Sequence, residues 1–391
     1  MRIAHIADVH FGLGYPGPTP AARFDDICRV MDWAADRMIE EEVQLVLVAG
    51  DLFRKADIAL DKASREIRAA TAWLRKLTAA GIEVVIISGT PSHDPVSAYD
   101  LLKDYQLPGV TIYTEPAVFY DWEVLITCLP GMDRSTFATR DEYRGLPAHV
   151  VHQMMTDHIT ETCHTLPAKV GEIPPNQPKI LLGHLTFDLA DKGFEDVLMQ
   201  QEAILTPEAI EGYDLVALGH IHRPQQNGKV FYSGSPERLS FNDEKVDAGF
   251  WIHEWDGDTG KQLPSRFIDT PARRYVTIKW DAEHLAAFIA GASSDPDCFD
   301  CGPIVRLHYT CSEELNKQLN RRALERDLYN AGAFFVAEIK GDIQRTDRAR
   351  DSEVTEAMGP VEALRRWGEN QGIPPSEIDE LAAMTAKLME G

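Results

Sequence analysis

Residues 2–10 read RIAHIADVH, an apolar run that ends at two side chains able to bind a metal ion, Asp8 and His10. Four later blocks repeat this pattern, namely Gly50-Asp51 after 45–49, Ser92-His93-Asp94 after 84–87, Gly183-His184 after 180–182 and Gly219-His220-Ile221-His222 after 215–218. Short apolar runs of this kind are typical of buried parallel strands, whose carboxyl ends form the ligand-binding edge of an α/β sheet. The five blocks therefore predict strands that bring His and Asp side chains to one edge.

The composition of these blocks predicts a centre with two metal ions. In Asp8-x-His10 and His220-x-His222 the side chains are two residues apart, so they face the same way in an extended chain. Carboxylates combined with imidazoles suit Mn, Fe or Zn better than Mg or Ca. The candidates exceed the four ligands of a closed structural zinc site, which fits two ions sharing a carboxylate, and Asp51 is the candidate for that role.

Weaker patterns have competing interpretations. A lone Gly-Asp or Gly-His-x-His is usually a turn beside a strand, so only the ordered set of five favours a site. Cys298-x-x-Cys301, with His308 and Cys311 downstream, either forms a small zinc site or is an ordinary pair of cysteines, and the ordinary pair is favoured because His308 lies in an alternating, strand-like run. The histidines at 149, 152, 158 and 164 fall on a helical stretch and are expected to lie on a solvated face.

Length and composition predict a multidomain globular protein of the cytoplasm. The chain has 391 residues, 44% of them hydrophobic and 26% charged, which predicts two or three domains. The amino terminus lacks the charged and apolar regions of a signal peptide, and no apolar run approaches 18 residues, so neither secretion nor a membrane span is expected. The six cysteines are scattered, as expected of a reduced protein.

The charge balance argues against indiscriminate coating of nucleic acid. The net charge is −23, whereas affinity for DNA rises with each phosphate that Lys or Arg neutralises. The acid excess is uneven, because residues 261–350 hold 14 Lys and Arg against 13 Asp and Glu. Basic groups such as Arg273-Arg274 are therefore available for phosphates, or they form an ordinary solvated surface.

Periodicity predicts the fold class α/β (α+β), with a two-layer β sandwich flanked by helices. The elements expected up to residue 255 are helices at 21–41, 61–80 and 146–166, a hairpin at 109–130, and strands at 230–232 and 250–255 that close a second sheet. A small α+β unit is expected at 273–342, with strands at 275–280, 303–310 and 333–340, and helices at 282–290 and 313–330, the latter capped by Ser312. Polar residues 343–356 suit a linker, and apolar stripes at 361–367 and 378–388 predict a helical hairpin too small to fold alone.

The blocks resemble the calcineurin-type metallophosphoesterase pattern, Asp-x-His, Gly-Asp, Gly-Asn-His-Asp, Gly-His and Gly-His-x-His. Within that superfamily, Gly50-Asp51-Leu52-Phe53 and Tyr232-Ser233-Gly234-Ser235-Pro236-Glu237-Arg238 resemble the SbcD nuclease family, the catalytic half of the SbcC–SbcD DNA repair complex. The order of elements after residue 260 is also similar, so the resemblance covers nearly the whole chain.

The resemblance implies a role for each candidate residue. It implies Asp8, His10, Asp51 and His222 around one metal ion, and Asp51, His184 and His220 around the other, with two Mn²⁺ as the cofactors. His93 is implied as the catalytic residue that stabilises or protonates at the scissile phosphate. The implied domains are a nuclease domain at 1–262, a DNA-contacting cap at 263–345, and a linker with a helical hairpin at 346–391.

The implied activity is hydrolysis of DNA by exonuclease and endonuclease cleavage in end processing, repair or recombination. The implied partners are duplex ends, single strands, an SbcC-type ATPase bound by the hairpin, and a second copy of the chain in a homodimer. Two other functions stay open: a metallophosphoesterase for a non-DNA substrate, and a DNA-end-binding scaffold with a weakened metal centre.

Two positions depart from the family pattern. Ser92 precedes His93 where the family has the Asn whose carbonyl binds the second metal, and the turn is two residues longer. A neutral hydroxyl is a poorer metal ligand than an amide oxygen, so a weaker second site is expected. Arg54 stands where some relatives carry a His that assists in handling DNA ends, so that role is not transferred.

Overall fold

The computed structural model describes residues 1–54, 64–91, 94–121, 123–132, 134, 137, 143, 145–171, 173–174, 176–193, 203–256, 259–291, 299, 301–344 and 358–390. The chain forms two compact units. The first comprises residues 1–278, 295–306 and 322–338, and the second comprises 279–294, 307–321 and 339–391. The predicted boundaries at 262 and 345 stay predictions.

A six-stranded sheet carries the first three blocks. Its strands are β1 (Arg2–Ile6), β2 (Leu45–Ala49), β3 (Glu83–Ile87), β4 (Val110–Tyr113), β13 (Gly249–Glu254) and β14 (Arg266–Asp269). The strand order is β14-β13-β1-β2-β3-β4, in which β1 to β4 run parallel and β13 pairs antiparallel with both β1 and β14. The parallel part explains the unbroken apolar sequences, because such strands are buried on both faces.

A second six-stranded sheet carries the last two blocks. Its strands are β5 (Ala117–Tyr120), β6 (Leu125–Leu129), β7 (Lys179–His184), β10 (Leu215–Gly219), β11 (Gln225–Asn227) and β12 (Val230–Tyr232). The order is β11-β12-β10-β7-β6-β5, with β6, β7, β10 and β12 parallel and both edge pairs antiparallel. A short parallel pair, β8 (Thr186–Phe187) and β9 (Ile204–Leu205), lies apart from it.

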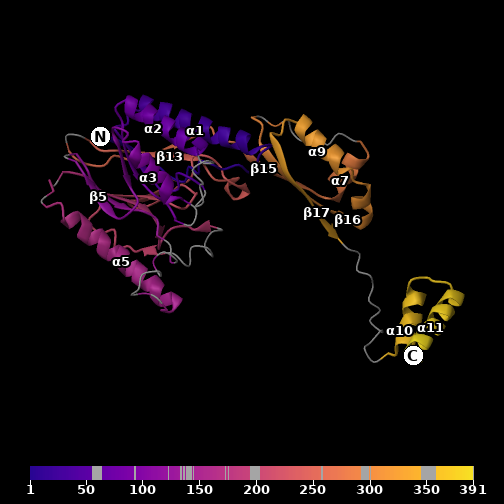
Figure 1. Ribbon diagram of the computed structural model, residues 1–391. Helices are drawn as coiled ribbons and strands as arrows, with labels where there is room; N and C mark the ends of the chain where they lie inside the picture. The colour runs from indigo at the N-terminus through magenta and orange to yellow at the C-terminus, as the bar shows by residue number, and fades with distance from the viewer. Residues whose placement is uncertain are drawn as a thin grey trace. The chain divides into compact units, whose positions relative to one another are not determined.

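The two sheets pack face to face and helices cover their outer faces. Apolar side chains of both sheets, such as Leu47 and Leu182, form the layer between them. Helices α1 (Pro20–Glu40), α2 (Ser64–Ala79) and α3 (Val96–Asp104) cover the first sheet, and α5 (Ala148–Ala168) covers the second (Figure 1). The predicted two-layer sandwich flanked by helices is therefore confirmed.

Local sequence explains where α1 begins. The Thr19 hydroxyl accepts a hydrogen bond from the Ala22 N–H at 3.1 Å, and Pro20 occupies the first helical position, where its missing N–H costs nothing. The predicted helices at 21–41, 61–80 and 146–166 correspond to α1, α2 and α5, although residues 61–63 lie outside the described part of the chain.

Two sequence expectations about strand pairing were wrong. Residues 109–130 do not form one hairpin, because β4 pairs with β3 in the first sheet whereas β5 and β6 pair in the second. Strands β12 and β13 do not close the same sheet, because β12 pairs with β10 and β13 pairs with β1. Both errors arise because neighbouring strands in the sequence cross between two sheets, which a short apolar run does not reveal.

The strands and helices predicted within 273–342 form a three-stranded sheet with helices, but they are not a separate unit, because both compact units contain parts of them. These elements are β15 (Tyr275–Trp280), α7 (Ala282–Ile289), β16 (Ile304–Ser312), α8 (Glu313–Gln318), α9 (Arg321–Asn330) and β17 (Phe335–Gln344), with the strand order β15-β16-β17. Ser312 caps as predicted, since its hydroxyl accepts from the Leu315 N–H at 3.3 Å. The single helix expected at 313–330 is instead two, because Leu319 adopts an extended backbone after α8.

The predicted C-terminal hairpin is also present. Helices α10 (Pro360–Asn370) and α11 (Pro375–Glu390) pack where Ile378 lies against Gly368, whose lack of a side chain allows the close approach. Gly372 ends α10 with a φ of +68°, a conformation that glycine adopts readily. Trp367 and Leu388 remain 52% and 81% exposed. Across the described residues, no helix combines the length and apolar character needed to cross a bilayer.

Two histidines are buried in the sandwich and stay uncharged. His5 of β1 is fully buried and its Nε2–H donates to the Leu218 carbonyl of β10 at 3.1 Å, so it joins the two sheets. Its ring stacks on that of His253 in β13, with 5.7 Å between ring centroids. Burial lowers the pKa of His5 to about 3, and burial, followed by electrostatic interaction with the neighbouring His5, holds the pKa of His253 well below its usual value.

We therefore expect acid to destabilise the fold before the carboxylates titrate. Below about pH 6.5 the unfolded chain protonates both histidines whereas the folded chain does not, so stability falls by up to about 1.4 kcal/mol per pH unit for each. This loss continues towards pH 3 and is absent above pH 7. In His5→Gln, urea unfolding with EDTA present should show a shallower fall in the free energy of unfolding between pH 6.5 and 4.5. The same change at exposed His149 is the control, and equal slopes in both variants would contradict the expectation.

Candidate metal centre

The ends of four strands, two from each sheet, supply the predicted site residues that the structure describes. Asp8 and His10 follow β1, and Asp51 follows β2, in the first sheet. His184 ends β7, and His220 and His222 follow β10, in the second. The centre therefore lies where the carboxyl ends of two packed sheets meet, whereas the sequence alone did not distinguish two sheets from one.

The loops after β1 and β2 run side by side. The N–H groups of Asp8 and His10 donate to the carbonyls of Gly50 and Asp51 at 3.2 and 3.0 Å. These bonds continue the parallel pairing of the two strands beyond their ends, so that Asp8, His10 and Asp51 are held in register.

Four of the site residues have left-handed backbone conformations. The φ values of Asp8, His10, Asp51 and His220 are 53°, 52°, 49° and 93°. Each such residue costs on the order of 1–3 kcal/mol, and this strain is characteristic of functional sites. The surrounding structure must hold these turns in place.

Glycines make the room that these side chains occupy. A Cβ atom on Gly89 would lie 1.8 Å from Asp51 Oδ1, and one on Gly50 would lie 2.3 Å from His184 Nδ1. A side chain at either position would displace a candidate ligand. This steric requirement explains why glycine precedes the ligand blocks at positions 50 and 89.

The donor atoms fall into two sets that fit two metal ions. Asp8, His10 and His222 form one, and Asp8, Asp51 and His184 form the other, with the donor atoms of each set within 4.8 Å of one another. Asp51 faces both sets, because its Oδ2 lies 3.7 Å from His10 Nε2 and its Oδ1 lies 3.4 Å from His184 Nε2. Buried carboxylate oxygens and imidazole nitrogens in such sets suit Mn, Fe or Zn.

His220 lies beside these sets. In the described part of the chain it belongs to neither of them. Its ring centroid is 5.1 Å from that of His184, and its backbone N–H donates to both carboxylate oxygens of Asp8 at 3.0 and 3.1 Å. His220 therefore orients Asp8 through its backbone, a contribution that the sequence did not indicate.

Backbone groups orient the ligands. The Nδ1–H of His184 donates to the Ala49 carbonyl at 2.8 Å, which fixes the tautomer and leaves Nε2 facing Asp51. The Ser235 hydroxyl donates to the Asp8 carbonyl at 2.6 Å. Contacts of this kind are a common accompaniment of metal-binding imidazoles and carboxylates.

Asp94 supports the site rather than facing it. Its buried carboxylate accepts hydrogen bonds from the N–H groups of Gly89 and Phe53 at 2.6 and 3.2 Å and from the Tyr99 hydroxyl at 2.5 Å. Burial, and then the negative charge of Asp51, raises the pKa of Asp94 to about 7. The sequence placed Asp94 in a ligand block but gave no indication of Tyr99, whose position on α3 is also that of an ordinary core residue.

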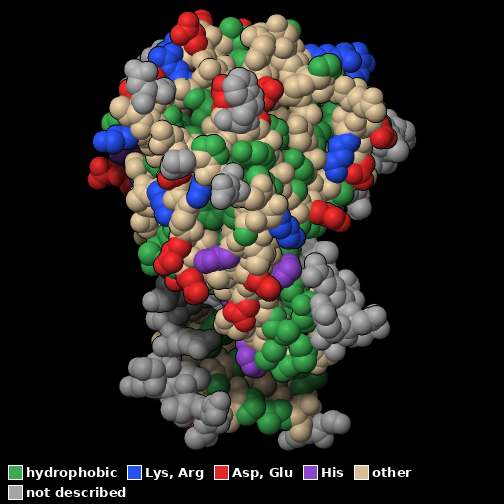
Figure 2. Space-filling view, turned by 90° about the vertical axis from the view of Figure 1, so that its left-hand side faces the viewer, with side chains coloured by type: hydrophobic (Ala, Val, Ile, Leu, Met, Phe, Trp, Pro, Cys, Tyr) green, Lys and Arg blue, Asp and Glu red, His purple; other side chains and the backbone are tan. Residues whose placement is uncertain are grey.

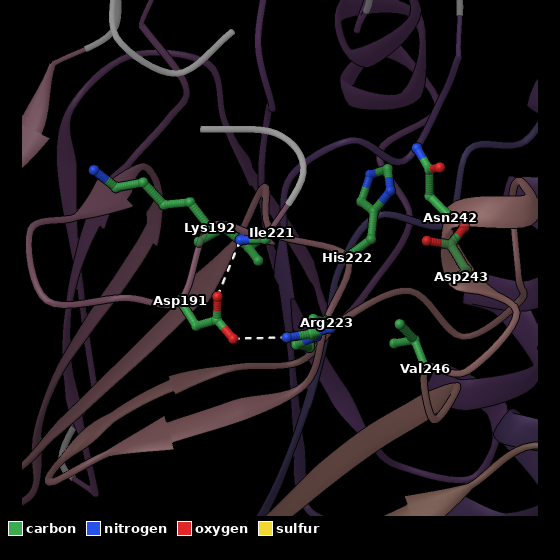
Figure 3. A pocket seen from close by; sticks show the side chains of 9 residues that line it. Asp191, Lys192, Ile221, His222, Arg223, Asn242, Asp243 and Val246 are labelled. Atoms are coloured by element: carbon green, nitrogen blue, oxygen red, sulfur yellow. Dashed lines mark hydrogen bonds and ion pairs between the residues drawn. The ribbon is translucent and has the colours of Figure 1, made fainter. Parts of the chain in front are cut away.

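A pocket opens beside His222. Three segments line it: Asp191–Gly193, Ile221–Arg223, and the stretch 242–246 through Asn242, Asp243 and Val246 (Figure 3). Arg223 Nη1 pairs with Asp191 Oδ2 at 2.6 Å. Figure 3 shows the His222 ring and the Asn242 side chain projecting from separate segments in the same direction.

Three residues singled out in the sequence lie outside the described part of the chain: Ser92, His93 and Cys298. The role of His93, the effect of Ser92 and the zinc alternative at Cys298 and Cys301 therefore stay predictions. Of the other cysteines in that pattern, Cys301 is exposed and Cys311 is buried, and both are free thiols.

The family of the protein follows from comparison with known sequences. A model of calcineurin-like phosphoesterases matches residues 1–224, more than half of the chain. The chain belongs to this family. Its members are phosphoesterases, a class of hydrolase, and the family implies divalent metal ions, for which the donor sets around Asp8 and Asp51 offer suitable ligands.

Individual proteins with similar sequences include DNA repair proteins and a nuclease subunit. The chain is 24% identical over 307 residues to the DNA double-strand break repair protein Mre11 of Methanopyrus kandleri, covering 72% of this chain and 61% of that protein. It is 28% identical over 232 residues to the protein of the same name from Aeropyrum pernix, covering 57% and 49%. It is 26% identical over 310 residues to the SbcD component of the SbcCD nuclease of Escherichia coli K12, covering 73% of each.

These findings confirm the predicted resemblance to the SbcD-like family of metallophosphoesterases. The alignments span about three fifths and one half of the two archaeal relatives. Ligand assignments for individual residues stay predictions. The geometry shows only which donor atoms lie close together.

Proposed function

We propose that this protein is a two-metal DNA nuclease, which hydrolyses phosphodiester bonds by exonuclease and endonuclease cleavage in end processing, repair or recombination. The observation that carries the proposal is the Asp51 carboxylate, one oxygen of which lies near His10 of one donor set and the other near His184 of the second, with Asp8 common to both sets. The names of the relatives, which describe DNA repair proteins and a nuclease, support DNA as the substrate.

In this proposal Asp8, His10, Asp51 and His222 would hold one Mn²⁺ ion. Asp51, His184 and His220 would hold the other. The second ion is the weaker, because Ser92 replaces the amide that the family places in its shell. Such ions supply Lewis acidity towards the phosphate oxygens and a nucleophilic water at neutral pH.

The residues of the chain then have separate tasks. Asp51 fixes the separation of the two donor sets, and the His184 bond to the Ala49 carbonyl keeps Nε2 available to a ligand. Asp94 holds the turn at Gly89 from behind. His93 gives a proton to the leaving oxygen of the scissile bond, which requires a titratable group near neutral pH.

The hold on DNA depends on other parts of the assembly. The net charge of −23 gives weak attraction for phosphates, and acidic and basic side chains are interspersed on the face shown in Figure 2. We propose that an SbcC-type ATPase, bound through α10 and α11, supplies much of the affinity for DNA, with the α+β region at 263–345 acting as the DNA-contacting cap. A homodimer and a cytoplasmic location complete the proposal.

A comparison of substrates tests this function. With Mn²⁺, linear duplex and circular single-stranded DNA should be cut, and EDTA should abolish cutting. His93→Ala should lose about 10²–10⁴-fold in rate while keeping its manganese by elemental analysis, because it removes a proton donor rather than a ligand. His220→Ala should lose metal. Equal metal loss in the two variants would refute this division of roles.

Two other outcomes identify the alternatives. Hydrolysis of bis(p-nitrophenyl) phosphate without any cutting of DNA would favour a metallophosphoesterase for a non-DNA substrate. Binding of DNA ends without hydrolysis at saturating Mn²⁺ would favour a scaffold with a weakened metal centre.

A further inference from the structure

A buried segment touches the backbone of two proposed ligands. In the loop after β12, the Ser235 hydroxyl donates to the Asp8 carbonyl at 2.6 Å, and the Ser235 N–H donates to the His222 carbonyl at 3.3 Å. Ser235 is buried, and Gly234 before it has a φ of +66° and lies close against Pro224. The position of this loop therefore fixes where the chain presents Asp8 and His222.

Two residues further on, the same loop binds the start of the α+β region. Glu237 is fully buried, and its carboxylate accepts from the backbone N–H of Arg273 at 2.9 and 3.2 Å. Glu237 also lies 3.4 Å from the guanidinium of buried Arg23 in α1. Arg273 stands between β14 and β15, so Glu237 joins the metal-centre loop to the chain that enters the three-stranded sheet.

Arg273 gathers contacts from several elements. Its guanidinium donates bidentate hydrogen bonds to the Asp26 carboxylate of α1, at 2.6 and 2.5 Å. It also donates to the carbonyl of Gly302, which precedes β16, at 2.6 Å. It also stacks over the ring of Phe334 before β17, 3.6 Å from the centroid. All of these residues belong to the first compact unit. A displacement of β16 or β17 at this end therefore reaches Arg273 directly.

A second connection leads to the pocket of Figure 3. Asn242, Asp243 and Val246 form the pocket wall that faces His222. Between them, Glu244 accepts hydrogen bonds from the N–H of Thr277 in β15, at 2.8 Å, and from the Thr277 hydroxyl. The wall of the pocket is therefore bonded to β15, in the same sheet whose strands β16 and β17 begin next to the residues that Arg273 contacts.

The buried charges suit a rigid coupling better than simple stabilisation. Buried ion pairs give little net stability compared with apolar packing, yet they hold one geometry because misplacing either partner leaves a charge unpaired. Packed interiors shift between discrete arrangements rather than deforming continuously. A network with Arg23, Asp26, Glu237 and Arg273 therefore transmits a change in the sheet rather than absorbing it.

We propose that residues 234–246 couple the β15–β17 sheet to the metal centre, so that a DNA strand bound by the sheet adjusts the placement of Asp8, His222 and the pocket wall. Ser235, Glu237 and Glu244 are positioning residues in this coupling. The identity of the bound polymer rests on the proposed nuclease function, whereas the coupling itself rests on the contacts above.

Glu237→Gln tests the coupling, because it keeps an oxygen for the Arg273 N–H and removes the charge that faces Arg23. On a duplex of about 30 base pairs, kcat should fall about tenfold with KM unchanged within about twofold, because a strand on the sheet no longer adjusts the placement of Asp8 and His222. Hydrolysis of bis(p-nitrophenyl) phosphate, which is too small to reach the sheet, should change less than about twofold. Glu41→Gln, which breaks the ion pair of Glu41 with Arg266 on the protein surface, is the matched control and should alter neither rate.

The second readout is the Mn²⁺ EPR spectrum of the holoenzyme. A non-hydrolysable phosphorothioate duplex should change the spectrum of the wild type and of Glu41→Gln but not that of Glu237→Gln. Thr277→Val, which removes the hydroxyl bonded to Glu244 without leaving a buried charge, should weaken the response if Glu237→Gln does not fold.

The outcomes separate the two proposals. Equal loss on both substrates, a change confined to KM for duplex, or no change at all would overturn the coupling. A wild-type spectrum that does not respond to duplex would overturn it as well. If the wild type binds duplex without cutting it, the nuclease proposal fails, and the loss of the spectral response in Glu237→Gln still decides the coupling.

Discussion

Asp51→Asn should abolish phosphodiester hydrolysis, with a loss on the order of 10³-fold or more, and should leave neither metal ion tightly bound. Asn keeps the size of the side chain and one oxygen, which still accepts the N–H of Thr90 now bonded to Asp51 Oδ1 at 3.0 Å. The amide nitrogen then faces His10, where Asp51 Oδ2 now lies 3.7 Å from Nε2. A neutral group that donates hydrogen bonds cannot join two cations, so both shells lose their shared anion.

Elemental analysis after gel filtration in Mn²⁺ buffer measures this effect, and circular dichroism checks the fold. Asp94→Asn is the matched control, because it removes another buried carboxyl group that interacts electrostatically with Asp51. The Asp94 carboxylate is bonded to Gly89, Phe53 and Tyr99 rather than directed at the donor sets. It should lower the melting temperature and keep the metal content. Two ions per chain in Asp51→Asn would show that another residue joins the two sites, and Asp8, which belongs to both donor sets, would be the next candidate.

The sequence predicted that His and Asp side chains gather at strand ends because that signal is local. Each apolar run gives a buried strand, and the residue types that follow immediately, such as Asp8 and His10, are placed by the strand end itself. The structure brings the described ligand candidates into or beside two donor sets as expected. The same local signal explains the success with α1, α5 and the C-terminal hairpin, whose apolar periodicity is contained in one stretch of chain.

The features that the sequence did not reveal depend on contacts between distant segments. The assignment of β12 and β13 to different sheets follows from pairings with β10 and β1, not from their own residues. His5 has the sequence environment of any strand residue, yet it bonds to Leu218 in the other sheet. Glu237 lies in a block that resembles the SbcD family and Arg273 in a basic pair, yet neither pattern reveals that the fold brings the two residues into contact.

The C-terminal hairpin shows what local pattern leaves undecided. Apolar stripes predicted α10 and α11, and Ile378 and Ala382 are buried. Leu381, Met384 and Leu388 follow one another at helical spacing along α11 and are exposed. Two helices of this length are marginal in water without further packing, so an exposed apolar stripe on them favours a partner.

Removing residues 352–391 should abolish association with an SbcC-type ATPase and leave the nuclease folded and active on short substrates. The change takes away α10 and α11 together with the end of the predicted linker and touches none of the donor sets. Association is measured by co-purification and sedimentation with the ATPase, and activity on bis(p-nitrophenyl) phosphate reports the metal centre. Leu388→Glu should reproduce the loss of association, because a charge in the exposed stripe is costly to bury against a partner.

Ala383→Glu is the matched control, since it adds the same charge to an exposed position of α11 away from the stripe of Leu381, Met384 and Leu388. It should bind the ATPase normally. A large fall in melting temperature on truncation, measured without the ATPase, would instead mean that the hairpin stabilises its own nuclease domain. Normal binding of the ATPase by Leu388→Glu would mean that the ATPase binds elsewhere on the chain. A docking role for α11 therefore requires that Leu388→Glu loses binding to the ATPase while Ala383→Glu keeps it.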